Sequence, residues 1–143
     1  MKVLIAYKSK GGATKKYMDW LAKDIEADIM EFDRIGNKFD FSKYDSIIVS
    51  SGTYMGLMPL NRFLKRNWKK LKNMNVVAVA VGAAPAEDPW SKWSYDRISR
   101  RIREHIQYFK ILGEIPAKAG ELKPTQVKRE NLSEVTHYIN KLE

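Results

Sequence analysis

The sequence predicts an α/β fold in which a five-stranded parallel sheet, ordered 2-1-3-4-5, lies between two layers of helices. Short apolar runs, typical of strands buried on both faces, alternate with segments of helical periodicity along the chain. Right-handed crossovers between such strands produce a parallel sheet covered on both faces. A small polar loop with adjacent glycines follows the first apolar run. The 143 residues contain no linker, repeat or low-complexity tract, which predicts a single domain, residues 1–143.

The chain opens with a strand, a tight loop and a helix. Residues 2–7 (Lys-Val-Leu-Ile-Ala-Tyr) form a short apolar run, which predicts a buried strand. Residues 8–14 (Lys-Ser-Lys-Gly-Gly-Ala-Thr) are mostly small and polar and predict a tight loop. Residues 14–27 predict a helix, because apolar side chains recur there at helical spacing: Tyr17, Trp20, Leu21 and Ile25.

The middle of the chain predicts three strands and one clear helix. A second strand is expected at 28–33, followed by a turn that a Gly-Asn pair marks. No regular helix is evident before the third strand at 45–52, so the second helix is expected to be short or irregular. A proline suits the first turn of a helix over 59–71. Residues 75–82 are the most hydrophobic run and predict a central strand.

The last third of the chain predicts a loop, two helices and a weaker strand. Residues 83–94, rich in Ala, Pro and Trp, predict a loop, and 95–107 predict a basic helix with isoleucines at four-residue spacing. The final strand is expected at 108–115, with a connection over 116–128. An Asn-x-x-Glu pattern that starts at Asn131 resembles a capping box. The helix after it places these apolar side chains on one face: Leu132, Val135, Ile139 and Leu142.

The loop after the first strand has the residue types of a phosphate site. Such a loop directs free backbone N–H groups and the positive end of the helix toward one point. Gly11 and Gly12 permit positive φ and close approach to a ligand. Ser9 and Thr14 offer hydroxyl donors, and Lys10 adds a positive charge. The spacing excludes the nucleoside-triphosphate and dinucleotide loops, and the alternative is an ordinary strand-to-helix turn with a Ser/Thr cap.

Residues 7–15 (Tyr-Lys-Ser-Lys-Gly-Gly-Ala-Thr-Lys) resemble the flavin-mononucleotide (FMN) phosphate loop of the flavodoxin family. They are most similar to its short-chain branch, which includes the flavodoxin-like protoporphyrinogen oxidases. The resemblance implies a flavodoxin-like three-layer sandwich that binds FMN as its cofactor. It also implies that hydroxyls and backbone amides of this loop hold the terminal phosphate. The residues to which the resemblance gives this role are Ser9, Lys10, Gly11, Gly12, Ala13 and Thr14.

Two further loops resemble the flavin-binding loops of the same family. In a sheet of this order, a ligand lies beyond the carboxyl ends of the strands, where loops after the first, third and fourth strands meet. Residues 51–56 (Ser-Gly-Thr-Tyr-Met-Gly) resemble the second flavin loop, which implies contacts from Thr53 and a ring stacked on Tyr54. Gly56, or Met55 if the spacing differs by one residue, would supply the peptide that hydrogen-bonds flavin N5.

The third loop, residues 82–94, offers small residues for backbone contacts to the polar edge of the ring. These are Gly82, Ala83 and Ala84. Trp90 and Trp93 are candidates for the second stacking face. For the tryptophans, as for the tyrosine of the second loop, the alternative is plain packing.

The absence of cysteine excludes a disulfide framework, a thiol nucleophile and a cysteine-ligated metal site. It also excludes the low-molecular-weight tyrosine phosphatases, which share this general architecture. Only His105 and His137 offer imidazoles, and they are far apart in the sequence, so we expect no metal site and no catalytic side chain. A response-regulator receiver would need acidic residues where this chain has Tyr-Lys and Ser-Ser after its first and third strands. Redox work would therefore require a bound cofactor.

The formal net charge of +9 predicts an anionic partner. Well-known flavodoxins are acidic, so this charge departs from the family pattern and puts the usual redox partners in doubt. We expect an acidic redox partner protein or an anionic membrane surface, and, without a recognised motif, no specific nucleic acid. Basic residues gather on the helix over 59–71 and just after it, and again within 95–107: Arg62, Lys65, Arg66, Lys69, Lys70 and Lys72, then Arg97, Arg100, Arg101 and Arg103.

The expected function is that of an FMN-binding electron-transfer protein. The alternative is an FMN-dependent oxidoreductase of the protoporphyrinogen oxidase type that uses a quinone or another acceptor. Those enzymes carry a longer insertion that covers the substrate, whereas this chain has only 83–94 there, which favours the carrier. A non-enzymatic binding module is a third alternative, because a fold alone proves no activity. No apolar run approaches the roughly eighteen residues of a membrane helix, and no signal-peptide pattern precedes the first strand. The expected location is cytoplasmic, with peripheral membrane association as an option.

Overall fold

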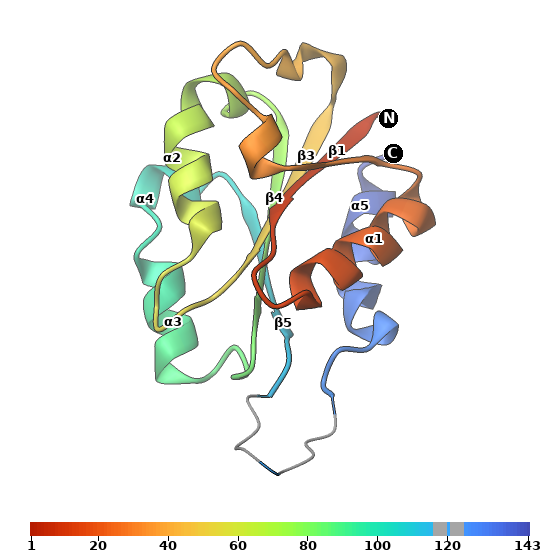
Figure 1. Ribbon diagram of the computed structural model, residues 1–143. Coiled ribbons are helices and arrows are strands. Elements are labelled where there is room, and N and C mark those ends of the chain that lie inside the picture. The colour runs from red at the N-terminus through yellow and green to blue at the C-terminus, as the bar shows by residue number, and fades with distance from the viewer. Residues whose placement is uncertain (116–119, 121–124) are drawn as a thin grey trace.

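Parallel strands form the central sheet of the computed structural model, which describes residues 1–115, 120 and 125–143. Five strands lie in the order β2-β1-β3-β4-β5, as the sequence predicts (Figure 1). Each neighbouring pair is parallel. Part of the connection expected at 116–128 lies outside the described residues. The strands are β1 (Val3–Lys8), β2 (Asp28–Glu31), β3 (Ser46–Gly52), β4 (Asn75–Gly82) and β5 (Gln107–Leu112).

Helices cover both faces of the sheet, so the architecture is the expected three-layer sandwich (Figure 1). On one face lie α1 (Ala13–Ile25) and α5 (Ser133–Lys141), and on the other lie α2 (Pro59–Leu71), α3 (Pro89–Asp96) and α4 (Arg100–Arg103). Short 3-10 turns, η1 (Phe32–Arg34) and η2 (Phe41–Lys43), take the place of a second regular helix, and η3 (Arg129–Leu132) precedes α5. No helix in the described part of the chain is long and apolar enough to cross a membrane.

Alternating side chains of the central strands divide the core between the two faces. On β1, Leu4 packs on the α2 side and Ile5 on the α1 side, and both are fully buried. Ile47 and Ile48 repeat this division on β3. Successive side chains of a strand point to opposite faces, so a strand covered on both sides is apolar at every position. This is why the inner strands stand out in the sequence as continuous apolar runs.

Two short helices replace the single helix expected at 95–107. Helix α3 begins inside the segment expected to be a loop, because the Asp88 carboxylate accepts a hydrogen bond from the Trp90 N–H (2.9 Å) and Pro89 occupies the first turn. The chain then turns inward at Ile98, which is 1% exposed, before α4 begins. The prediction was wrong because isoleucines at four-residue spacing mark buried positions and do not require an unbroken helix between them.

The predicted capping box at Asn131 is also wrong, because its side chain serves a tertiary contact. The Asn131 amide donates to the Tyr17 hydroxyl (2.8 Å) and to the Gln126 carbonyl (2.9 Å), while α5 starts later, after η3. The Tyr17 hydroxyl in turn donates to the carbonyl of Leu112, the last residue of β5 (2.5 Å). Tyr17 is fully buried and joins α1, the end of β5 and the approach to α5 at one point.

Removing the Tyr17 hydroxyl should therefore weaken the whole α1 face. We expect Tyr17→Phe to lower the free energy of unfolding by about 1–3 kcal/mol, because it removes the hydroxyl that joins the part-buried Asn131 amide to the part-buried Leu112 carbonyl. Urea denaturation measures this. Tyr138→Phe is the matched control, because no hydrogen bond of the Tyr138 hydroxyl is found within the described residues. Equal stability of the two variants would contradict the role given to Tyr17.

Candidate functional site

Loops that follow β1, β3 and β4 meet at the carboxyl edge of the sheet, the lower edge in Figure 1. The strands end level with one another, since Lys8 pairs with Ser51 and Gly52 pairs with Val81. The N–H of Thr53 extends this register by donating to the Val81 carbonyl (2.9 Å). The structure thus brings together the loops that the sequence assigns to one ligand.

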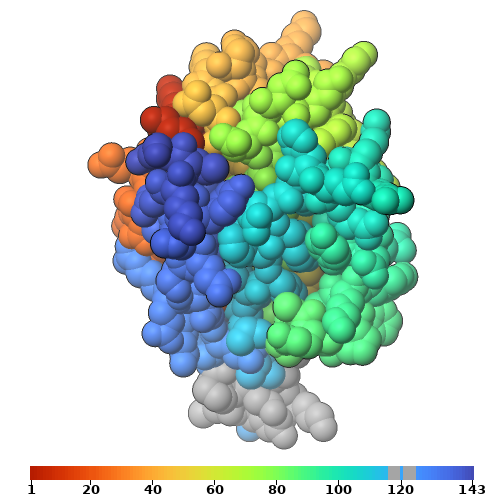
Figure 2. Space-filling model, turned by 180° about the vertical axis from the view of Figure 1, so that it is seen from behind, coloured from red at the N-terminus to blue at the C-terminus, as the bar shows by residue number. Residues whose placement is uncertain are grey.

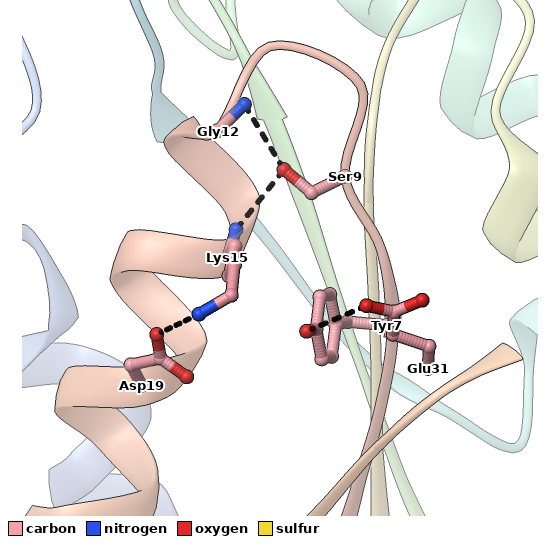
Figure 3. Close-up of polar contacts among 6 residues, drawn as sticks. All are labelled: Tyr7, Ser9, Gly12, Lys15, Asp19 and Glu31. Atoms are coloured by element: carbon pink, nitrogen blue, oxygen red, sulfur yellow. Dashed lines mark hydrogen bonds and ion pairs between the residues drawn. The ribbon is translucent and has the colours of Figure 1, made fainter.

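The first loop folds around the hydroxyl of Ser9. Its Oγ accepts hydrogen bonds from the backbone N–H groups of Gly12 and Lys15, at 3.2 Å each (Figure 3). Gly12 stands at the N-cap of α1 with φ of +94°, a conformation that favours glycine. A Cβ added to Gly11 or Gly12 would meet no atom within 4 Å, so open space lies beside the loop. The Ser9 hydroxyl hydrogen remains free to donate, because its oxygen acts here as an acceptor.

Backbone N–H groups of the same loop are left for a ligand. Among the described residues, no acceptor is found for the N–H groups of Gly11, Ala13 and Thr14. These groups belong to the loop and the first turn of α1, where the helix dipole adds positive potential. Thr14 is only 3% exposed, so its hydroxyl is less accessible to a ligand than the sequence suggests.

A cavity of about 280 Å³ lies on the β2 side of this loop. Tyr7 donates to a Glu31 carboxylate oxygen there (3.4 Å), and burial, followed by the charge of Glu31, raises the pKa of the Tyr7 hydroxyl (Figure 3). The Lys15 amine turns away to Asp19 (2.6 Å), a contact that raises the lysine pKa. The cavity therefore carries both signs of charge, and its lining is Tyr7, Lys8, Ser9, Lys10, Gly12, Lys15, Glu31, Phe32 and Asp33.

The second loop is a two-residue hairpin. Tyr54 and Leu57 exchange backbone hydrogen bonds of 2.8 and 3.0 Å, with Met55 at φ of +50° and Gly56 at φ of +85° between them. Positive φ at both central positions is the geometry of a type I′ turn. A Cβ at Gly56 would lie 2.0 Å from the Trp93 ring, so glycine is needed for the close approach as well as for the turn. Met55 is 80% exposed at the tip.

Tyr54 connects the second loop to the first. Its hydroxyl covers Gly52, where an added Cβ would lie 2.6 Å from the phenol oxygen. The Lys10 amine lies 5.5 Å from the centre of the Tyr54 ring. Burial raises the pKa of the Tyr54 hydroxyl, and a hydrogen bond from the backbone of Lys10 opposes that shift. The ring is still 37% exposed, so one side of it is accessible.

Two side chains that the sequence did not indicate hold the third loop by hydrogen bonds to its backbone carbonyls. The Lys110 amine donates to the carbonyls of Gly82 (3.3 Å) and Ala84, and the Gln126 amide donates to the carbonyl of Ala83 (3.0 Å). A trans peptide directs its N–H opposite to its C=O. The N–H groups of Ala83 and Ala84 therefore point away from the side chains that hold the two carbonyls before them.

The two tryptophans lie on α3 and not on a loop, which corrects the sequence expectation. Their ring centres are 5.5 Å apart in an edge-to-face arrangement, and Trp90 and Trp93 are 54% and 44% exposed. Trp93 rests on Gly56 and has the Arg97 guanidinium 4.9 Å from its ring centre. The second loop thus touches α3 directly, and a planar ring can lie on Gly56 only after Trp93 moves.

A sequence profile of the flavodoxin domain matches residues 4–128. The chain belongs to the flavodoxin family. No curated protein matches the chain in sequence. Two solved structures resemble it over nearly their whole length. Oxidised flavodoxin 1 from Bacillus cereus is 14% identical, with 96% of this chain and 94% of that one covered and a TM-score of 0.62. An archaeal flavodoxin is 18% identical, with 96% of this chain and 92% of that one covered and a TM-score of 0.61. Flavodoxin from Fusobacterium nucleatum, solved with flavin mononucleotide, is 12% identical, with 99% of this chain and 98% of that one covered and a TM-score of 0.56.

The residues of this flavodoxin-family chain fit an FMN phosphate. The open space beside Gly11 and Gly12, the N–H groups without acceptors and the Ser9 hydroxyl together form a cradle of donors. A phosphate dianion needs several such donors and no side-chain acid. The family profile does not separate this chain into the protoporphyrinogen oxidase branch or any other.

A basic groove of about 710 Å³ runs beside the second loop, along α2. Its cations come from the first loop, from α2 and, in the second basic group, from Arg97 alone. In that second group, Arg100 pairs with Glu104 and Arg103 with Asp96. Among the described residues that line the groove, Asp33 is the only acid. We define the basic groove by its cationic side chains: Lys8, Lys10, Arg62, Lys65, Arg66 and Arg97.

The contact between Gly56 and Trp93 can be tested without any ligand. We expect Gly56→Ala to lower the free energy of unfolding by about 1–2 kcal/mol, the order of the cost of left-handed backbone for a residue with a Cβ. It should also shift the tryptophan fluorescence, because the new methyl group displaces the Trp93 ring. Gly36→Ala is the control, since that site is open and its φ is not positive. Unchanged fluorescence in Gly56→Ala would contradict the contact.

Proposed function

We propose that this chain binds FMN at the carboxyl edge of its sheet and carries electrons on it. The observation that carries the proposal is the open cradle of the first loop. There, Gly12 at positive φ, the Ser9 hydroxyl and the N-terminus of α1 present hydrogen-bond donors beside open space. Membership of the flavodoxin family and a structurally similar flavodoxin solved with flavin mononucleotide support the same cofactor.

The chain's own residues would divide the work among the three loops. The first loop holds the phosphate. The N–H groups of Ala83 and Ala84 face away from Lys110 and Gln126 and can donate to the polar edge of the ring. Gly56 leaves the second loop free to present a peptide to the ring, and Tyr54 supplies an aromatic face. The bound flavin supplies the reversible uptake of electrons, while the protein sets its position and electrostatic field.

The alternative function is oxidation of an organic substrate beside the flavin, as in the protoporphyrinogen oxidases. Between β4 and β5, residues 83–106 are all described and form only the short helices α3 and α4 with their connections. A substrate would therefore have no long insertion above it in this part of the chain, which favours the carrier. The visible spectrum of the purified protein tests flavin binding, and oxidation of protoporphyrinogen with a quinone acceptor would identify the enzyme.

The phosphate cradle gives a direct test of the cofactor. We expect Gly12→Val to weaken FMN binding on the order of tenfold or more, because a branched side chain at positive φ distorts the loop and fills the space beside it. Riboflavin, which lacks the phosphate, should lose much less affinity. Flavin fluorescence titrations of both ligands measure this, with Gly36→Val as a control outside the site. Equal losses for FMN and riboflavin would exclude this loop as the phosphate site.

The basic groove supports an acidic protein as the redox partner. Except for Lys8, which lies 3.9 Å from Asp33, its cations have no ion-pair partner among the described residues. Two groove residues, Tyr54 and Leu57, add exposed apolar surface next to the flavin loops. A hollow of this size accepts a protruding acidic segment better than a flat membrane does, and complementary charge steers association.

Charge reversal should locate that partner face. We expect Arg62→Glu with Lys65→Glu to slow electron transfer from or to an acidic partner about tenfold or more at low salt, and much less at high salt. Lys69→Glu with Lys72→Glu makes the same change of charge at the far end of α2, outside the groove, and should have a smaller effect. Stopped-flow kinetics measure the rates. Binding to anionic vesicles, reduced only by the groove variant, would instead assign the groove to a membrane.

A further inference from the structure

Lys110 is a part-buried cation for which the proposed site has no assigned use. It is the only charged residue of β5, and its side chain reaches from the edge strand under the third loop. The cavity beside it, about 490 Å³, opens between β5 and α3. These two elements adjoin on the face shown in Figure 2, in cyan and green.

The Lys110 amine reaches the point where β3 and β4 end. A Cβ added to Gly82 would lie 3.3 Å from both Cε and Nζ of Lys110, and 2.2 Å from the Thr53 hydroxyl oxygen. Gly82 closes β4, and Thr53 follows β3. The positive charge therefore lies directly behind the peptides of the third loop, on the side opposite to their free N–H groups.

Lys110 supports the third loop through the carbonyls of Gly82 and Ala84, but that support does not by itself require a positive charge. The Gly82 carbonyl already accepts the Gly113 N–H (2.8 Å), so it stays paired without the lysine. Burial lowers the pKa of the Lys110 amine, and Asp88 opposes that shift. Lys110 has no ion-pair partner in the part of the chain that the structure describes. The other titratable groups around it line the cavity: Lys92, Tyr95, Asp96 and Tyr108.

We propose that Lys110 is a positioning residue that stabilises negative charge on the polar edge of a reduced flavin. The inference rests on the proposed function. A bound flavin would take two electrons from the proposed redox partner protein and one proton from water, and its ring would then carry one negative charge. The Lys110 ammonium binds the Gly82 carbonyl, and the N–H of the same peptide belongs to Ala83 and points the other way. The cation polarises this peptide and strengthens its N–H as a donor to the anion.

The test compares the affinities for oxidised and reduced FMN. We expect Lys110→Met to weaken binding of chemically reduced FMN roughly tenfold more than binding of oxidised FMN, the order for one unit charge a peptide away at a partly buried site. A tenfold change in this ratio lowers the two-electron potential by about 30 mV. Lys110→Arg should restore most of the ratio. Lys110→Gln, which keeps a donor without the charge, should behave like Lys110→Met and replaces it if the methionine variant fails to fold.

Two further readouts separate the charge from a supporting role. The effect should persist at high salt, because a part-buried charge is weakly screened, whereas the exposed Lys92→Met on the same cavity should give a smaller, salt-sensitive change. The pH at which the reduced flavin releases its ring proton should rise in Lys110→Met, since the anion is less stabilised. Equal weakening of both redox forms, or an unchanged ratio, would overturn the inference. Failure of the unaltered protein to bind oxidised FMN would overturn the proposed function, and this inference with it.

Discussion

The level, in-register pairing of β1, β3 and β4 is the constraint on which the site depends. Parallel strands carry their loops at one edge, and a shift of one residue would turn every core side chain to the wrong face. Leu4 pairs with Ile47 and Ile5 with Ile48, so burial on two faces fixes the register at the centre of the sheet. Because the register is fixed there, the first and second loops leave the sheet side by side. The sheet alone is therefore enough to bring Lys10 next to Tyr54.

The sequence predicted most of the fold because its signals were local. Continuous apolar runs identified the inner strands, and a proline marked the start of α2, which the structure confirms at Pro59. The errors arose where distant contacts decided the outcome. Asn131 has a sequence pattern that suits a cap, yet its amide is used by Tyr17, more than a hundred residues earlier in the chain. The Asp88 cap of α3 was a local signal that the sequence analysis missed.

The site divides in the same way. Residues within one loop could be proposed from their types, and the structure brings the proposed glycines, Ser9 and Tyr54 to one edge. Side chains that act on a loop from another strand could not be proposed, because only the folded sheet shows their reach. Lys110 and Gln126 hold the third loop from 28 and 43 residues away. The local sequence around Lys110 does not distinguish this residue from the many exposed lysines of this basic chain.

The stack of Trp93 on Gly56 has a consequence for how fast and how tightly the site is occupied. A molecule whose indole covers the glycine is closed to a planar ring, so only the open fraction of molecules is competent to bind. Apparent affinity falls in proportion to that fraction, and an open population of about one in a hundred would reduce it about a hundredfold, or roughly 2.8 kcal/mol. A single aromatic contact can therefore set both the apparent affinity of the site for a planar ring and the rate at which the empty site fills.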